Sequence, residues 1–360
     1  MYLINDLYKK RSGFLKFLYV LGSTFGTFPF RGNRMILNIQ LTIIIMFDIC
    51  HPYSLYEMIQ PYHIESTFPT MELNALLFQS FLFFVSHYSC VYGVFKHKIV
   101  WGKFLKIIDD LDGSNEVDTR HIVRMFVFFL VSGPVHLILY IYFNNIRGFY
   151  GVVYRLGKFL IILQLTFVTA FIWETTFFFT TKIEVMINDI NQLFSVKVCY
   201  KPAFVNGVEN LKTTMTKINE SIRCFNEAIG NQMLCLIIIS FGSILADFDF
   251  IIFAIKIVDF LFMLNYWTIG NTFFVMFSVI VILSCDRVEK KAEELIKTCI
   301  YIQASTGDEN ALALANLAKE LRPKFSAAGF FDINQRILPS FFSNLSTYLI
   351  IILQFKLSSL

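Results

Sequence analysis

The sequence predicts an all-α membrane protein that crosses the bilayer with seven transmembrane helices. Of its 360 residues, 56% are hydrophobic and 16% are charged, and the mean hydropathy is +0.58. Soluble domains carry about 25% charged residues. Apolar windows of about 20 residues recur along the chain, which is the length that a helix needs to cross a bilayer. The basic residues also concentrate in alternate connections between these windows.

Seven windows are assigned as spans. They are roughly residues 35–54, 73–95, 121–143, 158–181, 229–246, 262–285 and 337–355. No signal-peptide cleavage site follows the amino-terminal apolar residues, so the first span is expected to direct insertion. The segment IIFAIKIVDFLF follows the fifth window among Asp247, Asp249, Lys256 and Asp259. Because charged side chains are costly on a lipid-facing helix, we expect a short outer loop or rim there.

Lys and Arg indicate the orientation. Of the 31 basic residues, 26 fall in the amino-terminal segment and in the second, fourth and sixth connections. Basic residues mark the cytoplasmic side. We therefore expect a cytoplasmic amino terminus and an extracellular carboxyl terminus, opposite to a G-protein-coupled receptor. The stretch Cys285-Asp286-Arg287-Val288 resembles a motif of that class, but it ends the sixth span and is given no weight.

The predicted organisation has five parts. Residues 1–182 hold spans 1 to 4, 183–228 a cytoplasmic extension of span 4, 229–285 spans 5 and 6, 286–336 further cytoplasmic helices, and 337–360 the last span. A secondary transporter is disfavoured, because such proteins have paired Gly/Pro-broken helices in two matching halves.

Both long cytoplasmic connections carry heptad spacing, which predicts helices packed on other helices. The apolar series are Val208, Leu211, Met215, Ile218, Ile222, Phe225 and Ile229, and then Val288, Ala292, Leu295, Cys299 and Ile302. Lys201-Pro202 and Asn206-Gly207 are expected to break the helix before the first series. A third helix is expected over 308–322, with Leu314, Leu317 and Leu321 on one stripe. These helices either pack within one subunit or form an anchor between subunits.

Several classes of function are disfavoured. The six His show no metal spacing, and no nucleophile elbow, phosphate loop or metalloprotease helix is present. We therefore expect no catalytic residue, no bound metal and no cofactor. The protein is not expected to be an enzyme. The basic residues are dispersed among apolar blocks, which disfavours nucleic acid. On this topology Cys50 alone lies near the outer surface, so no extracellular disulfide is expected.

Polar residues at membrane depth are the candidates for function. Asp48, Arg124 and Glu174 are costly there, and a structural pair between Arg124 and Glu174 is favoured over a ligand role. A second group lies in the outer halves of spans two to six, where it would line an outward-opening cavity for a small organic molecule. Its members are Gln79, His136, Tyr140, Gln164, Thr169, Trp267, Asn271 and Thr272.

The last span contains TYLIIILQF, residues 347–355. Gln354 and Phe355 lie in its outer third, and Ile351 shares a face with Phe355 because the two are four residues apart. In a ring of such helices, the Phe side chains would form a hydrophobic constriction and the Gln side chains a wetted wall. The alternative is a polar helix end that contacts lipid headgroups.

Two motifs resemble the carboxyl-terminal signature of insect gustatory receptors. The first is AGFFDIN at 328–334, and the second is Thr347-Tyr348, five aliphatic residues and Gln354-Phe355. The resemblance extends more loosely over the whole chain. It implies a homotetrameric, tastant-gated cation channel in the plasma membrane of chemosensory neurons, with co-assembly with related receptors left open.

The resemblance also implies roles for residues. Gln354 and Phe355 match the family's gate, with Ile351 below them, and the cytoplasmic helices match its anchor. The implied partners are a small-molecule tastant and membrane lipid. The sugar-receptor branch typically has Glu after the Thr-Tyr pair, where this chain has Leu349. This departure favours a receptor for bitter plant compounds; the alternatives are a fructose-type receptor and, outside the family, a G-protein-coupled receptor.

Overall fold

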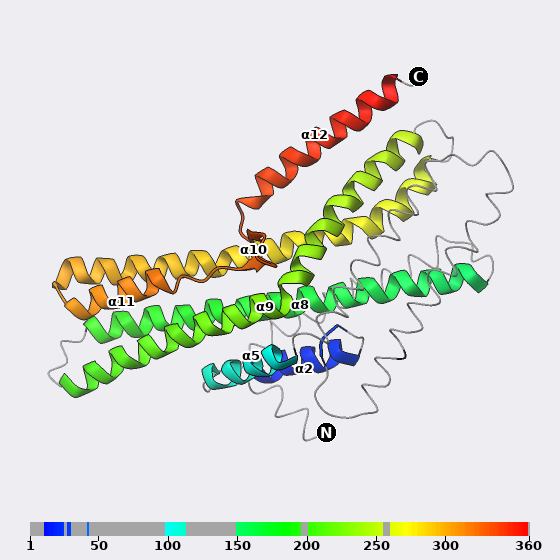
Figure 1. The fold of residues 1–360 in the computed structure, drawn as a ribbon. Coiled ribbons are helices and arrows are strands. Elements are labelled where there is room, and N and C mark those ends of the chain that lie inside the picture. Colours follow the sequence, from blue (N-terminus) through cyan, green and yellow to red (C-terminus); the bar gives the residue numbers. More distant parts are fainter. Residues whose placement is uncertain are drawn as a thin grey trace.

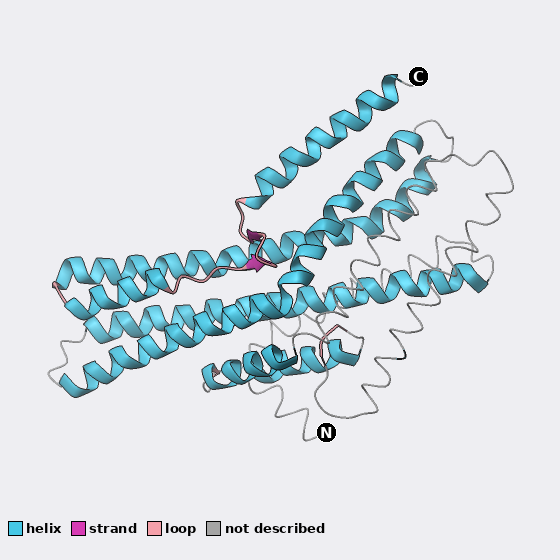
Figure 2. Cartoon of the chain, viewed as in Figure 1, coloured by secondary structure: helices cyan, strands magenta, loops and turns pink. Residues whose placement is uncertain are grey.

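The computed structural model describes residues 11–24, 27–29, 42, 98–112, 149–195, 201–254 and 260–358. The described part consists of helices and one short hairpin (Figures 1 and 2). The elements are α2 (Arg11–Thr24), α5 (Lys98–Leu111), α8 (Phe149–Ser195), α9 (Lys201–Ala254), α10 (Phe260–Thr306), α11 (Glu309–Glu320), β1 (Ser326–Ala327), β2 (Phe331–Asp332) and α12 (Ile337–Ser358). The predicted spans at 35–54, 73–95 and 121–143 lie outside the described residues, apart from residue 42.

Three long helices form the frame of the molecule. α8 has 47 residues, α9 has 54 and α10 has 47. At about 1.5 Å per residue they are about 70–80 Å long, more than twice the thickness of a bilayer core. They run together on one side of Figure 1, where α11 folds back along α10. Helices of this length reach well beyond a bilayer core.

Three helices in the described part contain an apolar window long enough to cross a membrane. These windows are Ile162–Phe194 in α8, Phe204–Leu245 in α9 and Ile337–Phe355 in α12. The fourth, fifth and seventh predicted spans overlap them, and the sixth, 262–285, lies within α10.

The predicted helix break at Asn206-Gly207 is wrong. α9 begins at Lys201, places Pro202 in its first turn, where proline is tolerated, and continues through both residues. A Cβ atom at Gly207 would lie 2.9 Å from Cδ1 of Leu193 on α8. The glycine therefore allows α8 and α9 to approach each other closely and does not end a helix.

The predicted outer loop after the fifth window is only partly described. α9 continues through Asp247 and Asp249 to Ala254, α10 begins at Phe260, and residues 255–259 between them lie outside the described residues. A helix satisfies its backbone hydrogen bonds internally, which favours its continuation at the membrane boundary even where the side chains are charged.

The two heptad series are buried inside this single chain. Every predicted position of the α9 series, from Val208 to Ile229, is at most 6% exposed, and every position of the α10 series, from Val288 to Ile302, at most 7%. In α11, Leu314 is buried, and Leu317 and the cap residue Leu321 pack half-buried against the core. The seam is therefore filled within one subunit, and contacts between subunits must use other faces.

Two shorter helices, α2 and α5, have no counterpart in the predicted elements. α2 packs on α8, and α5 packs on α9. Trp101 of α5 is 1% exposed, and its ring lies 5.0 Å from that of Phe28 and 5.2 Å from that of Phe171. The aromatic cluster that they form joins the amino-terminal segment, α5 and α8 into one core.

The thiol of Cys299 is expected to be inert in the folded protein. Burial raises its pKa to about 11, and the thiolate is the reactive form. At pH 7.5, N-ethylmaleimide should therefore leave Cys299 unmodified in the detergent-solubilised receptor and modify it after denaturation, as read by peptide mass spectrometry. Tyr301→Cys, at a position that is 74% exposed, is the matched control and should react quickly. Equal reaction at both positions would contradict the burial of the α10 seam.

Candidate functional site

α12 stands away from the bundle (Figure 1). Only 6% of its apolar window is buried inside the chain, compared with 83% for that of α8. Its contacts run along one face: Leu345 is buried, and the rings of Phe341 and Tyr348 meet that of Phe241 on α9 edge-on at 5.4 and 5.9 Å. So large an exposed apolar surface requires lipid or another protein chain to cover it.

The predicted gate residues lie on the outward sides of α12. Ile351 is 40% exposed and Phe355 73% exposed, and Gln354 is exposed too. Gln354 comes about two and a half turns after Leu345, so it points away from the face that packs on α9. These three side chains are thus presented to whatever surrounds α12.

The predicted ligand-binding residues are only partly described. Gln79, His136 and Tyr140 lie outside the described residues, and Trp267 and Asn271 are described only as positions on α10. Gln164 and Thr169 are buried on α8, and Thr272 is exposed on α10. Gln164 and Thr169 are about 1.4 turns apart and point to different sides of α8. Gln164 and Thr169 therefore do not share one face of α8.

Of the pair predicted at membrane depth, Arg124 and Glu174, the structure describes only Glu174. Glu174 is fully buried in α8, whereas Arg124, its predicted partner, and Asp48 lie outside the described residues. The part of the chain that the structure describes contains no cluster of three or more His, Cys, Asp and Glu residues suited to a metal ion.

The AGFFDIN motif forms a hairpin. Ser326 pairs with Asp332 and Ala327 with Phe331, in antiparallel register. Between the strands, Ala328 has φ +53° and Gly329 has φ +83°. Glycine adopts such left-handed conformations without strain, which explains its place in the turn.

The hairpin is fastened to α9 by a side-chain amide and a glycine. Nδ2 of Asn226 donates to the carbonyl of Lys324 at 2.7 Å, and Oδ1 of Asn226 accepts from the N–H of Ser326 at 3.1 Å. One turn later, a Cβ atom at Gly230 would lie 2.9 Å from the backbone nitrogen of Ala328. The hairpin backbone thus rests directly on the backbone of α9.

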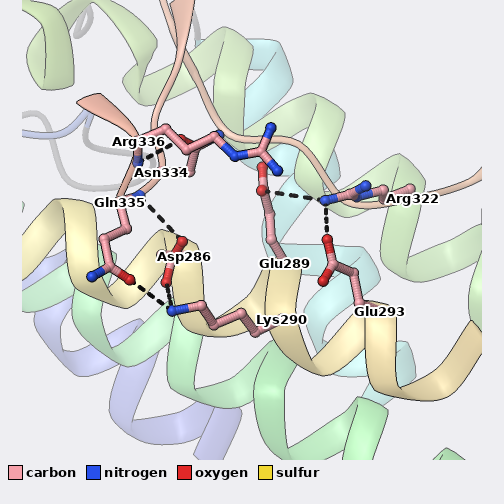
Figure 3. A network of polar contacts seen from close by, with 8 residues as sticks. All are labelled: Asp286, Glu289, Lys290, Glu293, Arg322, Asn334, Gln335 and Arg336. Atoms are coloured by element: carbon pink, nitrogen blue, oxygen red, sulfur yellow. Dashed lines mark hydrogen bonds and ion pairs between the residues drawn. The ribbon is translucent and has the colours of Figure 1, made fainter. Parts of the chain in front are cut away.

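The segment after the hairpin is fastened to α10 by a polar network (Figure 3). Oδ1 of Asp286 accepts from the backbone N–H of Gln335 at 3.1 Å, and Oδ2 lies 2.7 Å from Nζ of Lys290. The same Nζ donates to Oε1 of Gln335 at 2.7 Å. Gln335 therefore contacts α10 through its backbone and its side chain, just before α12 begins.

A second set of contacts lies further along α10. Arg322, just past α11, lies 2.5 Å from a carboxylate oxygen of Glu293 and 3.7 Å from one of Glu289. Burial raises the pKa of Glu289, and the Arg322 guanidinium opposes this rise. Residues of both sets line a cavity of about 250 Å³, whose lining consists of Asp286, Glu289, Lys290, Glu293, Arg322, Asn334, Gln335 and Arg336.

The sequence carries a signal for this network in the spacing of its charged residues. Asp286, Glu289, Lys290 and Glu293 follow spacings of three and four, which place them on one face of a helix. This charged face begins where the apolar run of α10 ends. It holds the end of α11 and the start of α12 on the same helix.

Comparison with known proteins agrees with this architecture. The chain resembles the solved structure of the insect olfactory receptor OR5 from Machilis hrabei, with a TM-score of 0.62 and 12% identity over 95% of this chain and 97% of that one. The structure of the same receptor in complex with eugenol gives a TM-score of 0.61 at the same identity and coverage. No curated protein shows significant sequence similarity to the chain. A model of the 7tm chemosensory receptor family matches residues 15–359, nearly the full length. The chain therefore belongs to the 7tm chemosensory receptor family.

Proposed function

We propose that four copies of this chain form a tastant-gated, non-selective cation channel, with α12 of each copy lining a central pore. The observation that carries the proposal is the exposure of α12, whose apolar window is only 6% buried within its own chain. An apolar helix that packs little against its own chain needs other apolar surfaces to cover it. In a ring of identical helices, the neighbouring copies of α12 cover one side and lipid covers the other. The polar residue Gln354 then faces water in the pore and not hydrocarbon.

The gate of this channel is assigned to Phe355, with Gln354 beside it and Ile351 below. A ring of exposed Phe side chains forms a constriction that excludes water, and ions do not cross a dry constriction. When the helices rotate or splay, Gln354 supplies a wetted wall. The bundle formed by residues 183–228 and 286–336 serves as the cytoplasmic anchor, using faces other than its filled seam.

The proposed ligand is a small organic compound that binds in the outer half of the membrane bundle. The related olfactory receptor OR5 was solved with eugenol, which is a phenol. We assign the site to the group that contains Gln164, Thr169 and Thr272. Binding shifts the population toward the open pore only if the affinity differs between the two states. Leu349 favours a bitter plant compound, with fructose as the second candidate.

The orientation is the first test. A tag after Leu360 should bind antibody on intact cells, and a tag before Met1 should do so only after permeabilisation, because the proposed topology puts the two ends on opposite sides of the plasma membrane. Whole-cell recording with eugenol, quinine and fructose should then show an inward cation current. If the tag after Leu360 needs permeabilisation, the pore assignment is wrong and a receptor coupled to a G protein becomes the better explanation.

A further inference from the structure

The chain between α11 and α12 forms a strap that joins two long helices. We define the strap as residues 324–335. Its first end is held on α9 by Asn226, which bonds the backbone on both sides of Phe325. Its last end is held on α10 by Asp286, which accepts the N–H of Gln335 at 3.1 Å. Phe325 and Ile333 are fully buried, and the N–H of Ile333 donates to the carbonyl of Phe325 at 2.7 Å.

The contact at the last end of the strap is of a strong kind. The Asp286 side chain is only 12% exposed, and both of its oxygens are engaged, one by Gln335 and one by Lys290. Hydrogen bonds to an ionised and largely buried carboxylate are about twice as strong as neutral ones. Lys290 closes a three-residue ring by donating to Oε1 of Gln335. We call this ring the clamp.

The clamp acts directly on the start of α12. The carbonyl of Gln335 accepts from the N–H of Leu338 at 3.2 Å, within the first turn of the helix. The same residue is thus bonded to Asp286 on one side and to α12 on the other. Figure 3 shows these side chains converging where the strap passes over α10. Gln335 thus links the start of α12 to α10.

We propose that the clamp formed by Asp286, Lys290 and Gln335 acts as a latch that holds α12 in the closed arrangement of the channel. The inference rests on the proposed function. The clamp ties the chain to α10 immediately before α12 begins, so a movement of α12 away from α10 has to lengthen or break its contacts. If opening the pore moves α12 in this way, a tastant must work against the clamp, and weakening the clamp shifts the population toward the open pore.

The test is the current that flows without any added compound. Asp286→Ala removes both contacts of the carboxylate, and the basal current per receptor at the cell surface should rise about tenfold, as expected for the loss of a charge-assisted hydrogen bond. Asp286→Asn keeps an acceptor for Gln335 and should give a smaller rise. Lys290→Met, at a position where the side chain is 61% exposed, should also raise the basal current and is the variant least prone to misfold.

Glu293→Ala is the matched control. Glu293 lies on the same face of α10, and its partner Arg322 holds the end of α11 and not the start of α12. Its basal current should equal that of the unmodified receptor. If Asp286 and Lys290 only supported the fold, their variants would lower the basal current together with surface expression. Release of a latch raises the basal current instead.

The outcomes separate the latch from the channel itself. If Phe355→Ala conducts without ligand while Asp286→Ala, Asp286→Asn and Lys290→Met stay silent at normal surface levels, the latch is overturned and the channel stands. If the clamp variants conduct and Phe355→Ala does not, the latch stands and the gate lies elsewhere. If Glu293→Ala conducts as much as Asp286→Ala, the effect belongs to the whole face of α10 and the latch is overturned. If no variant conducts, the latch and the proposed gate are both overturned.

Discussion

Replacing Phe355 with Ala should open a leak through the channel in the absence of any tastant. Phe355 is 73% exposed on α12, and in a ring of four helices its side chain forms the proposed constriction. Truncation to Ala widens this ring and removes apolar surface, so water and ions enter a pore that was dry. We expect a basal cation current about tenfold above that of the unmodified receptor, which corresponds to about 1.4 kcal/mol in the closed-to-open equilibrium. Whole-cell recording, normalised to surface receptor, measures it.

Leu353→Ala provides the control on the same helix. Leu353 is 42% exposed and lies two residues from Phe355, which puts it on the other side of α12. It should keep the channel closed without ligand. If Phe355→Ala stays closed as well, Phe355 is not the gate, and a leak of equal size in both variants would point to general loosening of α12.

Replacing Gly230 with Ala should destabilise the attachment of the hairpin to α9. The added Cβ would lie 2.9 Å from the backbone nitrogen of Ala328 and 3.1 Å from the backbone oxygen of Ser326. Backbone atoms cannot rotate away as a side chain does, so the hairpin must shift. We expect a loss of about 1–3 kcal/mol in stability, the range for overpacked sites. The midpoint of thermal unfolding in detergent should fall, and less receptor should reach the cell surface.

Gly207→Ala separates this contact from a general effect of alanine in α9. Its Cβ would also meet an atom at 2.9 Å, but that atom is the terminal methyl carbon Cδ1 of Leu193, which a rotamer change can move. Alanine also favours a helix over glycine by about 1 kcal/mol. The midpoint for Gly207→Ala should therefore equal or exceed that of the unmodified receptor. If Gly230→Ala behaves the same way, the close approach of the hairpin is not required for stability.

The elements that the sequence predicted well are those with a long, regular pattern. Val208, Phe225, Val288 and Cys299 belong to heptad series, and all of them are buried where the spacing placed them. Such series are reliable because a helix returns to the same face about every 3.6 residues. A buried stripe therefore shows as a regular spacing of apolar residues over several turns. The family resemblance, based on two short motifs, is confirmed by a match over residues 15–359.

Local signals were less reliable. Asn206-Gly207 carried a turn signal, but close packing against Leu193 explains the glycine. Asp247 and Asp249 counted against a lipid-facing helix, yet α9 continues past them to Ala254. In both cases the tertiary context outweighed the preference of one or two residues, because propensities amount to about 1 kcal/mol or less for such residues.

The sequence by itself determined the membrane class, the long helices and the burial of the heptad seam, since composition and periodicity act over many residues and need no knowledge of neighbours. The tertiary structure alone decided that the seam is filled within one subunit, that α12 stands apart, and that Asp286 meets Gln335. Along the chain, Asp286 and Gln335 are separated by the rest of α10, by α11 and by the hairpin. Contacts over such a distance along the chain leave no periodic trace, because they depend on how the connecting segments fold back.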